Sequence, residues 1–254
     1  MAQNYHVIAI DYRGFGHSTG SPTEEGLIQD GVSLVEFALH VAKVPPSQIV
    51  IYGQSLGTAV ASGVAEHFIN QGVEFAGVVL VAPFSSLADM LADYRISGYV
   101  PVLTPVKAWP GLLRWFQSFV VDKWRSVDRL ANVVRLTQTR LRLTFVHAKN
   151  DMDIPCDESN KLFKAAVNAT VPGGFDSEGF ENLKEAHTVH RGKDAFVSTW
   201  TADPNIVIRH EQFQYGGMSE HASSPESCAN ARLGHNDITG FSPVALAIMR
   251  SFEP

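Results

Sequence analysis

Residues 53–57 read Gly-Gln-Ser-Leu-Gly, the spacing of a serine nucleophile held on a sharp turn. The apolar run 49–52 precedes this pentapeptide and the small-residue segment 58–65 follows it, which predicts a strand, a tight turn and a helix. We expect the turn to leave no room for side chains at its two outer positions, which are both glycine. The hydroxyl group of Ser55 would then stand above the strand end and could attack a carbonyl carbon. The alternative is a buried strand–turn–helix with an inert serine.

A serine hydroxyl is a poor nucleophile unless a base removes its proton and an acid orients that base. On folds with this type of elbow, the acid follows the serine in the chain and a histidine comes last. The segment 147–155 follows an apolar run and carries two carboxylates at its centre. Asp151 is the favoured acid and Asp153 the second candidate. The alternative is that both are solvated loop residues.

The chain after the last predicted strand offers candidates for the base. His235 precedes the final predicted helix, where the third member of such a triad belongs, and is favoured over His221. His210 lies within a predicted strand and is typical of a paired sheet residue. His187 and His190 fall in a loop-rich segment and are interpreted as hydrogen-bonded surface residues.

An ester or amide substrate would also need two hydrogen-bond donors for the developing oxyanion. The backbone N–H of Leu56 is the first candidate donor, because it directly follows the serine. The second usually comes from a loop with a His-Gly pattern after an earlier strand, and no such loop precedes residue 6.

Short apolar runs alternate with helical segments, which predicts an α/β fold with a mostly parallel sheet flanked by helices. Ser21 is expected to cap the helix that follows it, with Glu24 completing a capping box. We expect a hairpin that turns at residues 202–204. The predicted strands are 6–11, 48–52, 75–82, 141–146, 196–201 and 205–214, and the predicted helices include 58–65, 157–166 and 242–252.

Residues 88–135 interrupt this alternation. They contain the aromatic residues Trp109, Trp115, Phe116, Phe119 and Trp124 and prolines at 101, 105 and 110. Such an insert after a strand fits a small helical cap over the site. The alternative is that these aromatic residues belong to the ordinary core.

The composition is that of a globular protein, with 254 residues, 45% hydrophobic and 18% charged. A net charge of −6 gives no reason to expect nucleic acid as a partner. Cys156 and Cys228 are interpreted as free thiols. No stretch is long enough to span a membrane and the first residues lack a signal peptide, so the chain as given is expected to be soluble. No metal or organic cofactor is implied.

Two segments near the start of the chain match a known family specifically. They are Asp-Tyr-Arg-Gly-Phe-Gly-His-Ser at 11–18 and Ser-Pro-Thr-Glu-Glu-Gly-Leu at 21–27. With segments 53–57 and 147–155, they make the chain similar to the α/β-hydrolase lipases of monoacylglycerol and lysophosphatidylserine lipase type and their fungal relatives. The resemblance implies a serine hydrolase acting on acyl esters. We interpret Arg13 as an anchor for its turn, with contact to a substrate carboxylate or phosphate as the alternative.

The resemblance also concerns the organisation of the chain. Members of that family have about three strands and an oxyanion loop before the strand that starts at residue 6, so we expect residues 1–254 to form a single, N-terminally incomplete domain. Relatives often carry an N-terminal membrane helix, so membrane association is expected only through an upstream segment or the cap. Residues 218–233 interrupt a Gly-Gly-His-Asn sequence and form an atypical insertion, interpreted as a retained intron or a surface loop.

Together these features predict a serine hydrolase with Ser55 as nucleophile, Asp151 as acid and His235 as base. The expected substrate is a small acyl ester, such as a monoacylglycerol or lysophospholipid. An amide or peptide hydrolase of the same fold is the first alternative. An inactive fragment or non-catalytic protein of this fold is the second.

Overall fold

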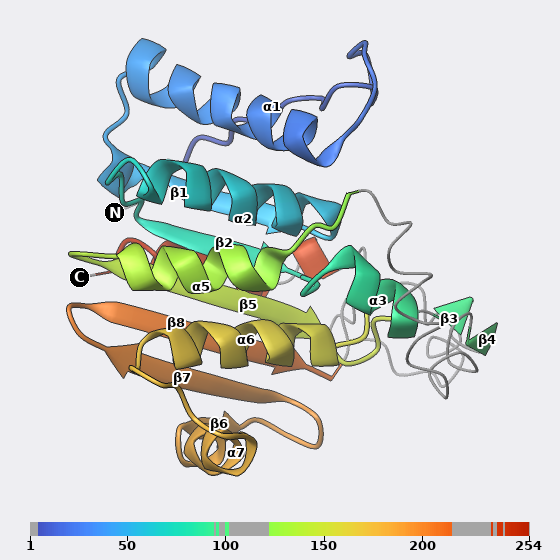
Figure 1. Ribbon diagram of the computed structural model, residues 1–254, viewed down its shortest axis with the longest axis vertical. Helices are drawn as coiled ribbons and strands as arrows, with labels where there is room; N and C mark the ends of the chain where they lie inside the picture. Colours follow the sequence, from blue (N-terminus) through green and yellow to red (C-terminus); the bar gives the residue numbers. More distant parts are fainter. Residues whose placement is uncertain are drawn as a thin grey trace.

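The computed structural model describes residues 5–93, 95–96, 100–101, 122–214, 235, 238–240 and 242–253. Within these residues, six strands form one sheet in the order β1-β2-β5-β8-β7-β6 (Figure 1). β1, β2, β5 and β8 run parallel, whereas β7 and β6 are antiparallel to their neighbours. The expected α/β fold with a mostly parallel sheet is therefore confirmed.

Helices and strands alternate along most of the chain up to the final hairpin, except that β3 and β4 are consecutive and α7 directly follows α6. The helices are α1 Glu24–Glu36, α2 Leu56–Ile69, α3 Leu87–Asp93, α5 Ser126–Leu136, α6 Asp157–Ala169, α7 Ser177–Ala186 and α9 Ser242–Arg250. The strands of the main sheet are β1 Val50–Gln54, β2 Gly77–Val81, β5 Leu141–Ala148, β6 Thr188–His190, β7 Phe196–Ala202 and β8 Ile206–Phe213. β3 Arg95–Ile96 and β4 Val100–Pro101 pair separately, and short helical turns cover Phe37–Val41, Pro46–Gln48 and Ile238–Gly240.

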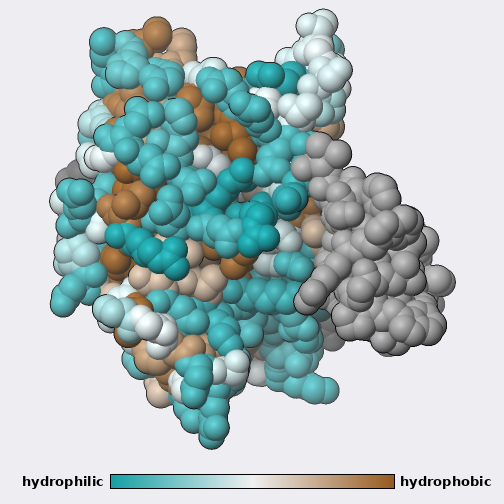
Figure 2. All heavy atoms as spheres, viewed as in Figure 1, coloured by the Kyte–Doolittle hydropathy of each residue, from teal (hydrophilic) through white to brown (hydrophobic). Residues whose placement is uncertain are grey.

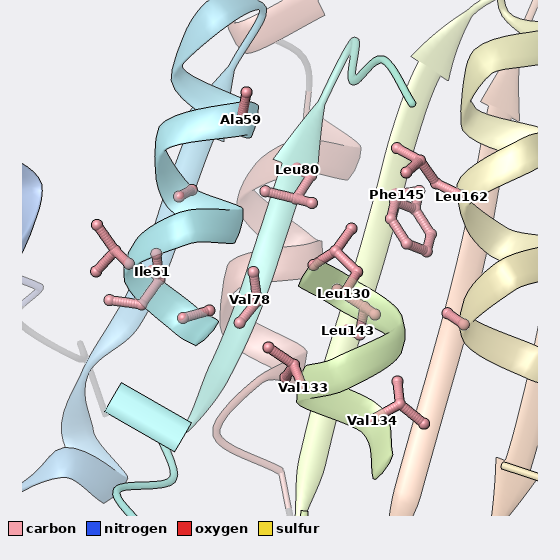
Figure 3. Packing of buried hydrophobic residues seen from close by; sticks show 14 of the residues in the cluster. Ile51, Ala59, Val78, Leu80, Leu130, Val133, Val134, Leu143, Phe145 and Leu162 are labelled. Carbon is pink, nitrogen blue, oxygen red and sulfur yellow. The ribbon is translucent and has the colours of Figure 1, made fainter. Parts of the chain in front are cut away.

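Helices α2, α5 and α6 pack against one face of the sheet, which Figure 1 shows toward the viewer. Successive side chains of a strand point to opposite faces, so alternate residues of β2 and β5 enter the core on this side. Val78 and Leu80 of β2 and Phe145 of β5 meet Leu130 of α5 and Leu162 of α6 there (Figure 3). The outer surface of the same helices is mostly hydrophilic, with hydrophobic residues showing between them (Figure 2).

The intervening residues of the same strands form a smaller cluster on the other face. Val79 and Val81 of β2 and Val146 of β5 pack there with Val244 and Ala247 of α9. The sheet is therefore covered on both faces, which explains why β2 and β5 are buried along their whole length.

The structure confirms most of the predicted strands and the predicted hairpin, with boundaries shifted by a few residues. The buried strand predicted at 6–11 is wrong, because this segment is exposed and pairs with no strand among the described residues. The side chain of Val7 is 92% exposed. A short apolar run becomes a strand only where another strand satisfies its backbone groups, and the apolar pattern alone does not report that partner.

The start of α1 also differs from the expected capping box. Thr23, not Ser21, is the N-cap, and its hydroxyl accepts the N–H of Gly26 at 3.1 Å. The carboxylate of Glu24 is used elsewhere, because it accepts the backbone N–H of Trp124 at 2.9 Å and pairs with Arg129 of α5. A long-range contact therefore displaces the local cap.

Arg13 anchors its turn, as expected. Its guanidinium group donates to both carboxylate oxygens of Asp30 on α1, and its backbone N–H donates to the same carboxylate at 2.8 Å. The hydrogen bond to Asp30 raises the pKa of Arg13. Gly26 makes room for this side chain, since a Cβ there would lie 2.7 Å from Cδ of Arg13.

Several sequence predictions fall on residues that the structure does not describe. Most of the expected cap lies outside the described residues, namely residues 94, 97–99 and 102–121. The insertion 218–233, which contains His221, also lies outside them.

Where the chain is described, no helix is long and apolar enough to cross a membrane. Part of the expected loop-rich segment is instead helix α7 and strand β6. His187, which follows α7, and His190, the last residue of β6, both lie at the surface.

His210 is the most unusual core residue of the sheet. It lies on β8, is 1% exposed, and neither ring nitrogen has a hydrogen-bond partner. The ring packs against Phe163 of α6 and Phe196 of β7, with centroids 5.7 Å and 5.0 Å away. Burial, with smaller contributions from the charges of Lys184 and His147, lowers the pKa of His210 well below its ordinary value of 6.5.

We predict that His210 makes the fold sensitive to acid. Because its pKa is lower in the folded state than in the unfolded state, its contribution to stability is lost as the pH falls below 6.5. His210→Phe should therefore flatten the pH dependence of the urea midpoint between about pH 7.5 and about pH 5.5. Parallel curves for the two proteins would contradict this role, and His190→Gln, at an exposed histidine, serves as the control.

Candidate active site

The predicted elbow forms where β1 ends and α2 begins. Ser55 has φ 52° and ψ −124°, a strained backbone conformation that raises its side chain from the end of the strand. Its N–H donates to the carbonyl of Val81 at 3.0 Å, and its carbonyl accepts the N–H of Thr58 at 2.9 Å. The neighbouring strand and the first turn of the helix thus hold the serine in this conformation.

The two glycines of the elbow are not equivalent. A Cβ at Gly53 would collide with the carbonyl group of Gly57 and lie 2.8 Å from the backbone nitrogen of Thr58. A Cβ at Gly57 would meet only the hydroxyl of Tyr12, at 4.0 Å. The expectation of crowding at both outer positions is confirmed at Gly53 and wrong at Gly57, because the second glycine faces outward from the turn.

The structure brings Ser55, His235 and Asp151 into one hydrogen-bonded chain. The hydroxyl of Ser55 lies 2.9 Å from Nε2 of His235, and Nδ1 of the same ring lies 2.7 Å from Oδ2 of Asp151. A carboxylate only accepts, so Nδ1 carries the proton and Nε2 is free to accept the hydroxyl proton of the serine. The three residues are separated by up to 180 positions in the chain.

The carboxyl group of Asp151 is buried and fully engaged. Its Oδ1 accepts the backbone N–H groups of Asp153 and Ile154 at 2.9 Å and 2.8 Å. Burial opposes its ionisation, but hydrogen bonds from His147 and His235 outweigh burial and lower the pKa of Asp151. It is therefore present as a carboxylate at neutral pH. Asp153, the second candidate acid, is exposed and contributes its N–H to this network.

The environment of His235 favours the protonated ring. Burial lowers the pKa of His235, but the hydrogen bond and charge of Asp151 outweigh burial and raise it above 6.5. The charge of Asp153 acts in the same direction. A ring with these neighbours can take a proton from the serine and hold it as an imidazolium.

Separate elements place the three side chains at one edge of the sheet. β1 and β5 are both parallel to β2, so their carboxyl ends, which lead to Ser55 and Asp151, lie together. His235 reaches the same place because Ile238, three residues on, is buried among the valines of the smaller core cluster. The side chain of Gln54 also donates to the carbonyl of His235, at 3.0 Å.

Comparison with known proteins assigns the family. The model of the alpha/beta hydrolase family matches residues 1–237. The chain belongs to this family. It is 32% identical to human protein ABHD12B over 65% of this chain and 42% of that relative. It is 28% identical to zebrafish lysophosphatidylserine lipase ABHD12 over 67% of this chain and 42% of that relative. It is 29% identical to the Escherichia coli K12 protein YfhR over 71% of this chain and 56% of that protein.

The chain thus spans less than half the length of these two vertebrate relatives. Among solved structures, an alpha/beta hydrolase from Vibrio vulnificus is 23% identical, with a TM-score of 0.42 over 53% of this chain and 44% of the other. The fold of the family is the one expected from the sequence.

Two polar residues of this alpha/beta hydrolase site escaped the sequence analysis. Gln54 sits inside the Gly-Gln-Ser-Leu-Gly pattern, and nothing in the pattern signals its bond to His235. His147 opens the segment that contains Asp151, and its ring lies 3.3 Å from that carboxylate. A histidine directly after the predicted strand 141–146, four positions before the candidate acid, was the available signal for His147.

The remaining candidate is the oxyanion donor. Leu56 is the first residue of α2, and N–H groups in the first turn of a helix have no intrahelical acceptor. The N-terminal end of the helix dipole adds a favourable field for negative charge there. Over the described residues, no cluster of His, Cys, Asp and Glu could hold a metal ion.

We predict that the two elbow glycines differ in their tolerance of alanine. Gly53→Ala should destabilise the fold by roughly 1–3 kcal/mol, because the new methyl group must push aside backbone atoms rather than a flexible side chain. Gly57→Ala, the matched control on the first turn of α2, should leave stability unchanged or raise it by up to ~1 kcal/mol. Urea unfolding measures both values, and equal losses would contradict this account of the elbow.

Proposed function

We propose that this alpha/beta hydrolase is a serine hydrolase that cleaves acyl esters. The observation that carries the proposal is the short chain of hydrogen bonds from the hydroxyl of Ser55 through His235 to Asp151. In this order of groups, the imidazole takes the serine proton as the oxygen attacks the acyl carbon. The buried carboxylate of Asp151 stabilises the imidazolium that results.

The reaction then proceeds through an acyl-serine intermediate. Attack by Ser55 forms the new C–O bond, and His235 returns the proton to the departing alcohol as the ester C–O bond breaks. Water, deprotonated by the same histidine, next attacks the acyl carbon. The acyl–serine C–O bond breaks, His235 returns the proton to the oxygen of Ser55, and the acid is released. We assign the N–H of Leu56, the first residue of α2, as a donor to the oxyanion in both steps.

A lipid monoester is the substrate class we favour. The support is the similarity to zebrafish lysophosphatidylserine lipase ABHD12, at 28% identity. The same three groups would also serve an amide hydrolase, so the ester assignment rests on this similarity and not on the triad. A non-catalytic protein of the same fold is the remaining alternative.

A fluorophosphonate probe tests the nucleophile. The 254-residue chain should be labelled covalently, and Ser55→Ala should abolish labelling, because the probe reacts with an activated serine hydroxyl. Ser33→Ala is the matched control, since this serine on α1 is exposed and its hydroxyl donates to the carbonyl of Gln29. Labelling that survives in Ser55→Ala, or a folded chain that takes no probe, would overturn the proposal.

Hydrolysis of matched substrates tests the substrate class. A monoacylglycerol and a lysophosphatidylserine should be cleaved, and the amide of the same acyl chain should be cleaved far more slowly. Ser55→Ala should lower kcat on the esters by about a million-fold, the scale seen when a triad serine is removed. Faster release of acid from the amide than from both esters would favour the alternative reaction.

A further inference from the structure

His147 is a buried histidine beside the candidate acid that the proposed mechanism does not use. It is the penultimate residue of β5, and its side chain is fully buried. Its Nε2 lies 3.0 Å from the carbonyl oxygen of Ile154 and 3.3 Å from Oδ2 of Asp151. Its Nδ1 is hydrogen-bonded to the hydroxyl of Ser159 on α6. Every polar atom of the ring thus has a partner.

These partners fix where the ring carries its proton. The carbonyl of Ile154 and the carboxylate of Asp151 can only accept, so Nε2 must donate. In the neutral ring Nδ1 is then an acceptor, and the hydroxyl of Ser159 donates to it. A serine on α6 therefore selects the tautomer of His147, and the ring points its single N–H at the acid loop, residues Asp151–Ile154.

The acid loop is closed by two sets of bonds that meet at Ile154. The N–H of Ile154 and that of Asp153 donate to Oδ1 of Asp151, which folds the loop onto its own carboxylate. The carbonyl of Ile154 faces the other way and accepts from His147. The bonds within the loop set its shape, whereas His147 ties that shape to the end of the sheet.

We propose that His147 is a positioning residue that holds the acid loop so that Oδ2 of Asp151 stays against His235. Its effect on catalysis rests on the proposed serine hydrolase function, whereas its effect on the coupling of Asp151 and His235 does not. Both rings approach the same carboxylate oxygen, Oδ2, from different elements. A shift of the loop would lengthen the bond between Asp151 and His235 directly.

The other charged groups near this network are few among the described residues. Asp153 acts on His235 through its charge. On the neighbouring strand β8, His210 lies close enough to His147 to respond to any charge that forms on that ring. Any change in the titration of His235 on substitution of His147 must therefore be read against these two groups, and neither is altered in the variants below.

Nuclear magnetic resonance of ¹⁵N-labelled histidine rings in the 254-residue chain tests the proposal without an activity assay. We expect His147 to carry its proton on Nε2 and His235 to titrate above 6.5. In His147→Leu, which removes the N–H, the pKa of His235 should fall toward 6.5, because Asp151 is no longer held against the ring. A proton on Nδ1 of His147 in the unsubstituted chain would overturn the proposal.

Two further variants of His147 form a matched pair. The amide of His147→Gln can reach the position of Nε2 and should restore the pKa of His235, whereas the shorter amide of His147→Asn cannot. Ser159→Ala should give a smaller fall, because it frees the tautomer and keeps the ring. If His147→Leu does not fold, these three variants decide. Control substitution His190→Gln, at an exposed histidine, should change nothing.

Kinetics separate positioning from a merely structural role. If the chain hydrolyses esters, His147→Leu and His147→Asn should lower kcat by roughly tenfold to a hundredfold with little change in KM, as expected for a misplaced reacting group. Folded variants with the pKa of His235 and kcat unchanged would overturn the proposal. A chain that takes no fluorophosphonate probe, yet shows the predicted coupling of His147 and His235, would overturn the hydrolase function alone.

Discussion

At the elbow, the backbone of Gly53 lies so close to the carbonyl of Gly57 that strand β1 and helix α2 can join here only without a side chain at position 53. This contact compresses the turn and forces Ser55 into a strained conformation. The bond from its N–H to Val81 of β2 keeps it there. The placement of the Ser55 hydroxyl, the direction of the Leu56 N–H and the approach of His235 all depend on this turn.

The site is assembled from residues that the chain separates widely. β1 and β5 lie on either side of β2 and run parallel to it, so the loops after them open at the same edge. A buried carboxylate at such an edge is costly unless hydrogen bonds satisfy it. Asp151 receives two backbone N–H groups and two imidazoles, which explains how it remains charged without solvent.

Where the sequence analysis failed, a long-range partner decided the local structure. The apolar run 6–11 has the composition of a strand, but no described strand pairs with it and it remains exposed. Ser21 and Glu24 have the spacing of a capping box, but Glu24 bonds to Trp124 and Arg129 instead. Local patterns report what a segment can form, and tertiary contacts select among those forms.

The sequence alone determined the alternation of buried strands and helices, the turn at Ser55 and the identity of the three candidate groups. These follow from local signals: apolar runs, glycine spacing, and the order of serine, acid and histidine along the chain. Only the tertiary structure gave the physical reason for preferring Asp151 to Asp153, since the carboxylate of Asp151 bonds to His235 and Asp153 is exposed. It also revealed the hydrogen bonds of Gln54 and His147, because bonds between residues far apart in the chain produce no recognisable pattern in the sequence.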